Sequence, residues 1–293
     1  MFPASFEYEH AGTVEEALAF REERDDAEVE LLAGGHSLLP TMKAGLASPD
    51  VVIDIGGIDS LRGVEPNDGT VRIGALTTYS DIVGDEDLRE SIPVVVEAAQ
   101  AIGDVQVRNR GTIGGNIAHA DPASDLPAAL LAADATIVAE GPNGKRSIKA
   151  DNFFTGLYET ALDEDELLTE IEVTTHDIGV YAKKPSPSSG YAMVGVAAVL
   201  GLDGGTVESA RVAATGAVDH ATQLTGVEEA LLGTPLDGEA AATAASHASD
   251  GIDEFQLMDD HQASAEYRRQ LLGNYTQRAL AAAADEINRP GTK

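Results

Sequence analysis

Two glycine-containing segments are the parts of this chain best suited to chemistry. The first, residues 32–40, and the second, residues 112–125, each contain two adjacent glycines. Paired glycines allow backbone N–H groups to converge on an anion and allow the main chain to approach a pyrophosphate closely. Two such segments in one chain favour the binding of a single long cofactor that carries phosphate groups.

Two better-known phosphate-binding motifs do not fit. The glycines of the first segment are adjacent rather than spaced as G-x-G-x-x-G, which disfavours a standard NAD-type Rossmann domain. Residues 141–146 resemble a P-loop, but Lys145 is followed by Arg146 instead of Ser or Thr. We therefore predict a hairpin turn at that position.

The cysteine and histidine content limits the redox chemistry of the chain. It has no cysteine, which excludes disulfides, iron–sulfur ligation and thiol nucleophiles within this subunit. Its seven histidines are scattered and show no short spacing typical of a zinc site. Redox activity would therefore need an organic cofactor, and we predict neither a metal site nor a catalytic side chain.

The chain is strongly acidic, with 50 acidic and 19 basic residues and a formal net charge of −31. Such a charge disfavours nucleic acid as a partner. The acidic residues are spread along the whole chain, and we interpret them as a halophilic surface whose self-repulsion is screened in concentrated salt; the alternative is an acidic mesophilic protein. No apolar run is long enough to span a membrane and no signal peptide is evident, so we expect a cytoplasmic protein without a membrane span.

Hydrophobic periodicity and turn signals predict an α+β chain in several parts. Residues 1 to about 60 form a βαβ-like unit in which Thr13 caps a helix and strand 29–33 leads into the first glycine segment. Up to about 178 we expect strands 71–75, 136–139 and 167–173 and helices 93–101 and 126–133. Residues 183–190 look like a linker, which places a domain boundary near 176–190. Beyond it we expect two strands, 191–201 and 207–215, followed by alanine-rich helices.

An ordered set of motifs is similar to one protein family. Residues 33–43, 106–116 and 121–127, followed by 181–183 and 190–198, closely resemble the FAD-binding medium subunit of molybdenum hydroxylases, the family of aerobic carbon monoxide dehydrogenase and xanthine dehydrogenase. The resemblance covers nearly the whole chain. It implies a two-subdomain FAD-binding fold of the PCMH (vanillyl-alcohol oxidase-like) type over 1–178, with subdomains of about 1–60 and 61–178. It also implies a C-terminal α+β domain of the carbon monoxide dehydrogenase flavoprotein type over 179–293.

The resemblance also implies which residues contact FAD. Both glycine segments would supply backbone N–H groups to the pyrophosphate, and three polar side chains within them would add hydrogen bonds: Ser37, Thr112 and Asn116. The implied contacts are Leu32, Ala33, Gly34, Gly35, His36, Ser37, Thr112, Ile113, Gly114, Gly115, Asn116, Asp125, Leu168 and Lys183.

Several of these residues have a second interpretation. Asp125 is also well placed to cap a helix that begins at residue 126, and Lys184 competes with Lys183 for the cofactor contact. His36 and His119 are either flavin neighbours or hydrogen-bonded structural residues. Tyr191 either stacks near the isoalloxazine or fills a core, and we predict the core.

The function implied by the resemblance is electron transfer through FAD. The partners would be a large molybdopterin-binding subunit and a small 2Fe–2S subunit, assembled as a dimer of heterotrimers, and the substrate would be oxidised on another chain. The Ala-Gly-Gly-His-Ser form of the first segment and the chain length favour the carbon monoxide dehydrogenase-like branch. Two alternatives stay open: a free-standing FAD-dependent oxidoreductase of the same fold, and an interaction protein that has lost the flavin.

Overall fold

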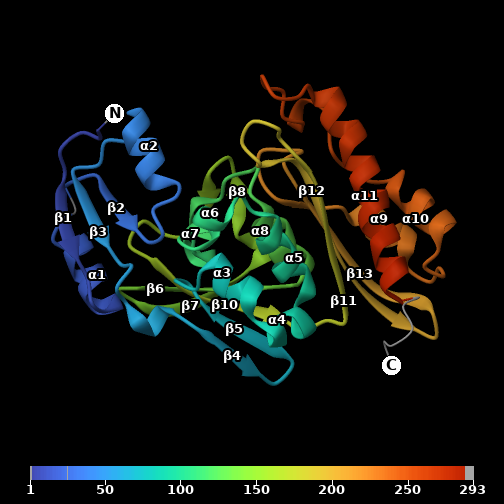
Figure 1. Ribbon diagram of the computed structural model, residues 1–293, viewed down its shortest axis with the longest axis horizontal. Coiled ribbons are helices and arrows are strands. Elements are labelled where there is room, and N and C mark those ends of the chain that lie inside the picture. The colour runs from blue at the N-terminus through green and yellow to red at the C-terminus, as the bar shows by residue number, and fades with distance from the viewer. Residues whose placement is uncertain (1, 25, 288–293) are drawn as a thin grey trace.

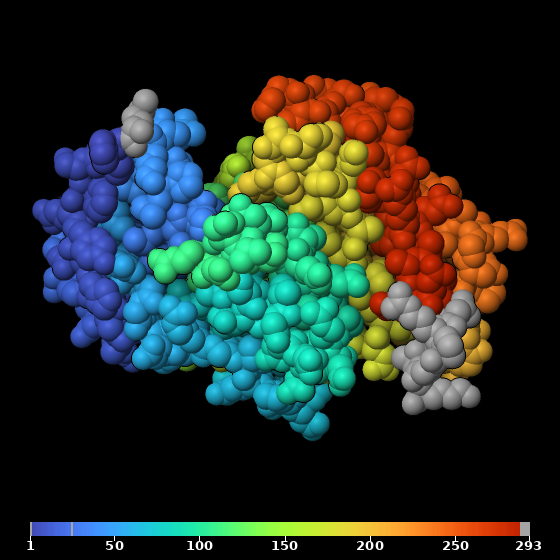
Figure 2. All heavy atoms as spheres, viewed as in Figure 1, coloured from blue at the N-terminus to red at the C-terminus, as the bar shows by residue number. Residues whose placement is uncertain are grey.

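The computed structural model describes residues 2–24 and 26–287, which form three parts in chain order (Figure 1). An N-terminal unit and a C-terminal domain lie at opposite ends, and a middle domain separates them. In the space-filling view these parts appear in blue, in yellow to red, and in cyan to green, respectively (Figure 2). No helix in the described residues is long and apolar enough to cross a membrane.

The N-terminal unit is a small parallel sheet with helices. Its elements are β1 (Glu7–His10), α1 (Val14–Glu22), β2 (Val29–Leu32), α2 (Leu38–Ala44), β3 (Val51–Asp54) and the 3-10 turn η1 (Asp59–Leu61). The strand order is β1-β3-β2 with both pairings parallel, which confirms the predicted βαβ-like unit. Thr13 caps α1 as predicted, since its Oγ1 accepts the backbone N–H of Glu16 at 3.1 Å. Central strand β3 is almost wholly buried, whereas β2 lies at a sheet edge.

The middle domain contains an antiparallel sheet covered by helices. Its strands are β4 (Val64–Asn67), β5 (Thr70–Gly74), β6 (Thr136–Gly141), β7 (Gly144–Lys149), β8 (Phe154–Gly156), β9 (Glu159–Thr160) and β10 (Leu167–Thr174). Its helices are α3 (Tyr79–Gly84), α4 (Glu86–Ser91), α5 (Pro93–Ala101), α6 (Val105–Arg108), α7 (Ile113–His119), α8 (Asp125–Ala132) and the 3-10 turn η2 (Ala150–Asn152). The main sheet has the order β4-β5-β10-β6-β7. Residues 141–144 form the β6–β7 hairpin, which confirms the predicted turn.

The C-terminal domain packs a second antiparallel sheet between two sets of helices. Its elements are β11 (Ile178–Pro185), β12 (Ala192–Asp203), β13 (Thr206–Thr215), β14 (Thr222–Gln223), α9 (Thr225–Leu231), α10 (Gly238–Ala245), η3 (Glu254–Gln256) and α11 (Ala265–Ile287). Helix α11 contacts β11 and β12, while α5 and α8 of the middle domain contact the same sheet (Figure 1). The predicted C-terminal domain extends to residue 293, and its last six residues lie outside the described part.

The linker interpretation of residues 183–190 is wrong for the first three of these residues. Strand β11 continues to Pro185, because Lys183 and Lys184 pair with Gly195 and Val194 of β12. Cross-strand pairing therefore overrides the turn-forming composition, and only the residues after Pro185 form the connection to β12.

Candidate functional site

A cavity of about 470 Å³ lies between the N-terminal unit and the middle domain. Its walls come from β2, the first glycine segment, α2, the start of β10 and the N-terminal half of the second glycine segment, including much of α7. This volume is in the range of protein sites for cofactors and drug-sized ligands. The structure therefore brings the two glycine segments to one cavity.

Gly34 places the first segment directly against the chain that leads into the second. A Cβ at Gly34 would overlap the carbonyl oxygen of Arg110 and would lie 2.9 Å from its carbonyl carbon and 3.0 Å from Gly111 Cα. Gly35 has φ +75°, a left-handed conformation that favours glycine. The first glycine thus permits close contact between segments, and the second permits the turn that follows β2.

The first segment presents unused hydrogen-bond donors. Among the described residues, no acceptor binds the backbone N–H groups of Gly34, Gly35, His36 and Ser37, and all four residues line the cavity. The Ser37 hydroxyl also has no partner in the described part of the chain. Consecutive free N–H groups on residues that line a cavity are a natural site for an anion such as a diphosphate.

The second segment differs from expectation, because its glycines lie in the first turn of helix α7. Thr112 caps this helix, and its Oγ1 and carbonyl oxygen accept the N–H groups of Gly115 at 3.3 Å and Asn116 at 3.0 Å. The N–H groups of Ile113 and Gly114 bind the carbonyl oxygens of residues 77 and 75 at 3.0 and 2.8 Å. These four N–H groups, which we expected to face the pyrophosphate, are already satisfied within the chain.

The glycines of α7 instead allow close packing. A Cβ at Gly114 would lie 2.5 Å from Ala75 Cβ and 2.7 Å from the Ala75 carbonyl oxygen. A Cβ at Gly115 would lie 2.8 Å from Thr112 Oγ1 and 3.4 Å from Ala33 Cβ. The second segment therefore packs against Ala75 and Ala33 and forms the part of the wall next to the first segment.

Most of the predicted contact residues line the cavity, and four do not. The lining members of the predicted set are Ala33, Gly34, Gly35, His36, Ser37, Thr112, Gly114, Gly115, Asn116 and Leu168. Leu32 precedes the first glycine pair, and Ile113, the first residue of α7, is fully buried. Asp125 and Lys183 also lie outside the lining, and they contact each other. Their role as FAD contacts remains a prediction.

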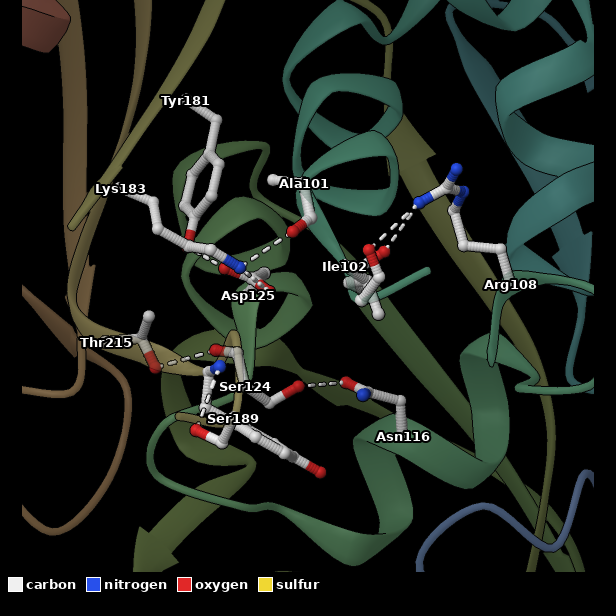
Figure 3. A network of polar contacts seen from close by, with 12 residues as sticks. Ala101, Ile102, Arg108, Asn116, Ser124, Asp125, Tyr181, Lys183, Ser189 and Thr215 are labelled. Atoms are coloured by element: carbon white, nitrogen blue, oxygen red, sulfur yellow. Dashed lines mark hydrogen bonds and ion pairs between the residues drawn. The ribbon is translucent and has the colours of Figure 1, made fainter. Parts of the chain in front are cut away.

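Asp125 and Lys183 form a buried ion pair in which Tyr181 takes part (Figure 3). Lys183 Nζ lies 2.8 Å from Asp125 Oδ2 and donates to the Ala101 carbonyl oxygen at 2.7 Å, and the Tyr181 hydroxyl donates to Asp125 Oδ1 at 2.5 Å. The side chains of Asp125 and Lys183 are only 5% and 8% exposed. Burial raises the pKa of Asp125, and the charge and hydrogen bond of Lys183 and the Tyr181 hydrogen bond oppose that rise.

This geometry rejects the alternative interpretation of Asp125 as a helix cap. Asp125 is the first residue of α8 rather than its cap, and its carboxylate binds side chains of β11 instead of helix N–H groups. Ser124 occupies the cap position, but its hydroxyl donates to Asn116 Oδ1 at 2.8 Å (Figure 3). Lys183, and not Lys184, is the lysine bound to Asp125, and the choice between the two as the FAD contact stays open.

Aromatic residues at the cavity were mostly missed by sequence reasoning. Tyr79 lines it, with its ring against Gly111, and burial raises the Tyr79 pKa. Tyr158 also lines it, at φ +56°, with its ring centroid 5.2 Å from that of His119. Burial raises the pKa of Tyr158 to about 12 and lowers that of His119. Tyr191 is 43% exposed, so its predicted place in a core is wrong.

Comparison with known proteins identifies the family. Residues 4–175 match the FAD binding domain in molybdopterin dehydrogenase, and residues 180–283 match the CO dehydrogenase flavoprotein C-terminal domain. The chain belongs to the FAD-binding medium subunits of the molybdenum hydroxylases. It is therefore an FAD-binding subunit of an oxidoreductase, and the cavity with four free N–H groups fits the diphosphate of that cofactor.

Relatives of this medium subunit align along almost their whole length. The carbon monoxide dehydrogenase medium chain of Hydrogenophaga pseudoflava is 40% identical over 286 residues, which cover 97% of this chain and 98% of that one. The glyceraldehyde dehydrogenase medium chain of Sulfolobus acidocaldarius is 38% identical over 282 residues, which cover 96% and 99%. A solved structure of the Hydrogenophaga pseudoflava carbon monoxide dehydrogenase matches with a TM-score of 0.92 and covers 97% of this chain and 99% of that one, at 40% identity.

Proposed function

We propose that this chain is the electron-transfer subunit of a molybdenum hydroxylase complex, in which it receives electrons from iron–sulfur clusters on a partner chain and delivers them to an external acceptor. The observation that carries this proposal is the cavity lined by both glycine segments, with the free N–H groups of residues 34–37 on one wall. FAD supplies the redox chemistry there, because a flavin exchanges electrons singly or in pairs and so links a two-electron substrate site to one-electron carriers.

The residues of the chain divide the task of holding the cofactor. The first glycine segment would bind the diphosphate through its N–H groups and the Ser37 hydroxyl, and the Asn116 and Leu168 side chains, which also line the cavity, would contact the cofactor. Thr112 would act mainly by capping α7. The Asp125–Lys183 pair would lie at the flavin end, because Asn116 is hydrogen-bonded to Ser124, the residue before Asp125.

Oxidation of the substrate on another chain is supported by two observations. The chain has no cysteine to hold an iron–sulfur cluster. In addition, relatives whose names refer to carbon monoxide and to glyceraldehyde align over the same length at nearly equal identity. A subunit shared by complexes with such different substrates is suited to electron transfer rather than to substrate selection.

The partners we propose are a large molybdopterin-binding subunit and a small 2Fe–2S subunit, in a dimer of heterotrimers within the cytoplasm. Among the substrate branches we favour the carbon monoxide dehydrogenase-like one. Two carbon monoxide dehydrogenase medium chains are 40% and 33% identical to this chain over 97% and 96% of its length. The first glycine segment also has the Ala-Gly-Gly-His-Ser form that favours this branch.

Affinity purification of the tagged chain from its native host tests this assignment. We expect a yellow complex that releases FAD and contains a large molybdenum-bearing chain and a small iron-bearing chain. Anaerobic carbon monoxide should bleach the flavin absorbance of the complex but not that of the isolated subunit. Bleaching of the isolated subunit by an alcohol or a lactone would instead identify a free-standing oxidoreductase.

A further inference from the structure

The flavin end of the proposed site is held from outside the matched FAD-binding domain. Tyr181 and Lys183 are alternate residues of β11, in the C-terminal domain, and each donates a hydrogen bond to one oxygen of Asp125 at the start of α8 (Figure 3). The two donors reach opposite oxygens of the carboxylate. They therefore fix its rotation as well as its position.

The surroundings of Tyr181 are arranged to bring its hydroxyl to this point. Its backbone N–H donates to Glu97 Oε2 at 2.7 Å, which holds the strand against α5. Gly195 lies beneath the ring on neighbouring strand β12, where a Cβ would overlap the Tyr181 hydroxyl and lie 2.8 Å from Cζ. Only glycine leaves room there for a phenol directed at Asp125.

We propose that Tyr181 is a positioning residue of the flavin site, which acts through Asp125 by holding one oxygen of its carboxylate. This role rests on the proposed function, in which Asp125 faces the flavin. Lys183 compensates the charge, and Tyr181 supplies the second donor that a buried carboxylate needs. Tyr181 is thereby distinguished from a residue that merely fills the interface between the two domains.

Loss of the Tyr181 hydroxyl has a definite electrostatic consequence. The other groups that face Asp125 are Asp121, Tyr79 and Tyr191, which are acidic or neutral and do not replace the lost donor. A carboxylate that loses a hydrogen bond becomes a stronger base, so the pKa of Asp125 rises. As the pH is lowered, FAD binding should then begin to weaken at a higher pH than it does in the native chain.

The test compares the full-length chain with Y181F and with the control Y267F, whose tyrosine is partly exposed on α11. The dissociation constant of FAD is measured from flavin fluorescence between pH 4.5 and 8.5. We expect Y181F to bind FAD roughly tenfold more weakly at neutral pH, the scale of one lost hydrogen bond to a charged group, and its binding to fail about one pH unit higher. Y267F should match the native chain.

Two further measurements separate this role from simple packing. In D125N, addition of Y181F should cause no further loss of FAD affinity, because the hydroxyl acts through the carboxylate. G195A keeps the phenol but displaces it from Asp125, so it should shift the pH dependence of FAD affinity in the same direction as Y181F. If Y181F does not fold, G195A tests the same role.

The outcomes distinguish the two proposals. If Y181F lowers only the melting temperature and leaves both FAD affinity and its pH dependence unchanged, the positioning role is overturned while the proposed function stands. Additive effects of D125N and Y181F overturn it as well. If the native chain itself takes up no FAD, the proposed function fails and the role of Tyr181 fails with it.

Discussion

Substitution of Gly34 by alanine tests whether the contact between the two glycine segments matters for FAD binding. The added Cβ would lie 2.9 Å from the carbonyl carbon of Arg110, whereas an ordinary contact begins at 3.4 Å. The segments must therefore separate by about half an ångström at that carbon, and by more at the carbonyl oxygen, which the Cβ would overlap. Both obstacles are backbone atoms, so no side-chain rotation can relieve the clash.

The expected cost has the magnitude of overpacking in a rigid site. Inserted methyl groups of this kind typically cost about 1–3 kcal/mol, which corresponds to a roughly 5- to 150-fold loss of FAD affinity if the strain is borne in the bound state. G45A is the matched control, because Gly45 has φ +74° at the end of α2 and nothing lies within 4 Å of an added Cβ. It carries backbone strain of about 1–2 kcal/mol without separating the segments.

The assay is titration with FAD by calorimetry, together with thermal unfolding of the cofactor-free chain. We expect G34A to lose FAD affinity and G45A to lose only stability. An FAD dissociation constant for G34A within twofold of the native value would refute the idea that the two segments must touch to form the site. Equal losses in both variants would assign the effect to general destabilisation.

Three further predictions concern buried charge, pH and salt. K183M leaves Asp125 as an uncompensated buried carboxylate, so urea denaturation should show a loss of about 3–5 kcal/mol in unfolding free energy, whereas K184M should change little because Lys184 takes no part in the pair. His176 binds the Thr174 carbonyl oxygen through Nδ1 at 3.0 Å, and its buried Nε2 has no partner in the described residues, so burial lowers its pKa. The unfolded chain therefore binds a proton at His176 more tightly than the folded chain does. The free energy of unfolding should then fall as the pH drops below about 6.5. H176Q should reduce this dependence of the unfolding free energy on pH between about pH 7.5 and 5.5. Finally, a surface with net charge −31 should give a melting temperature that rises with KCl from dilute buffer to about 1 M; an unchanged melting temperature would contradict the halophilic interpretation.

Local sequence signals predicted the elements whose stability is itself local. The apolar run over residues 93–101 predicts a helix that coincides with α5, where Pro93 takes the first helical position. The parallel unit at the N-terminus was likewise visible in its capped helix and its strands. The strand over residues 183–185 was missed, because its formation depends on pairing with β12 rather than on its own composition.

The glycine pairs show why the site itself was only partly predictable. Both pairs have the same composition, yet Thr112 precedes the second and folds it into a helix whose N–H groups are all bound, whereas Ser37 follows the first and makes no side-chain cap bond. The sequence indicated where the chain approaches a ligand but not which donors stay free. Tyr158 carried no signal at all, since its position depends on the β8–β9 hairpin that follows from tertiary packing.

The turn between α7 and α8 explains why the proposed site depends on all three parts of the molecule. Thr215 Oγ1 lies 2.7 Å from the carbonyl oxygens of both Pro122 and Ser124, and the N–H of Gly216 binds Pro122 as well, at 2.7 Å. The buried Arg268 of α11 in turn donates to the Gly216 carbonyl oxygen at 2.6 Å.

These bonds lead from the C-terminal helix to Ser124, and hence to Asn116 on one side and Asp125 on the other. Residues that follow the matched FAD-binding domain thus set the geometry of residues within it. A change in the C-terminal domain can therefore alter FAD affinity without contact with the cofactor, because Thr215 and the N–H groups of Ala192 and Gly216 in that domain hydrogen-bond the carbonyl oxygens of residues 122–124 in the turn.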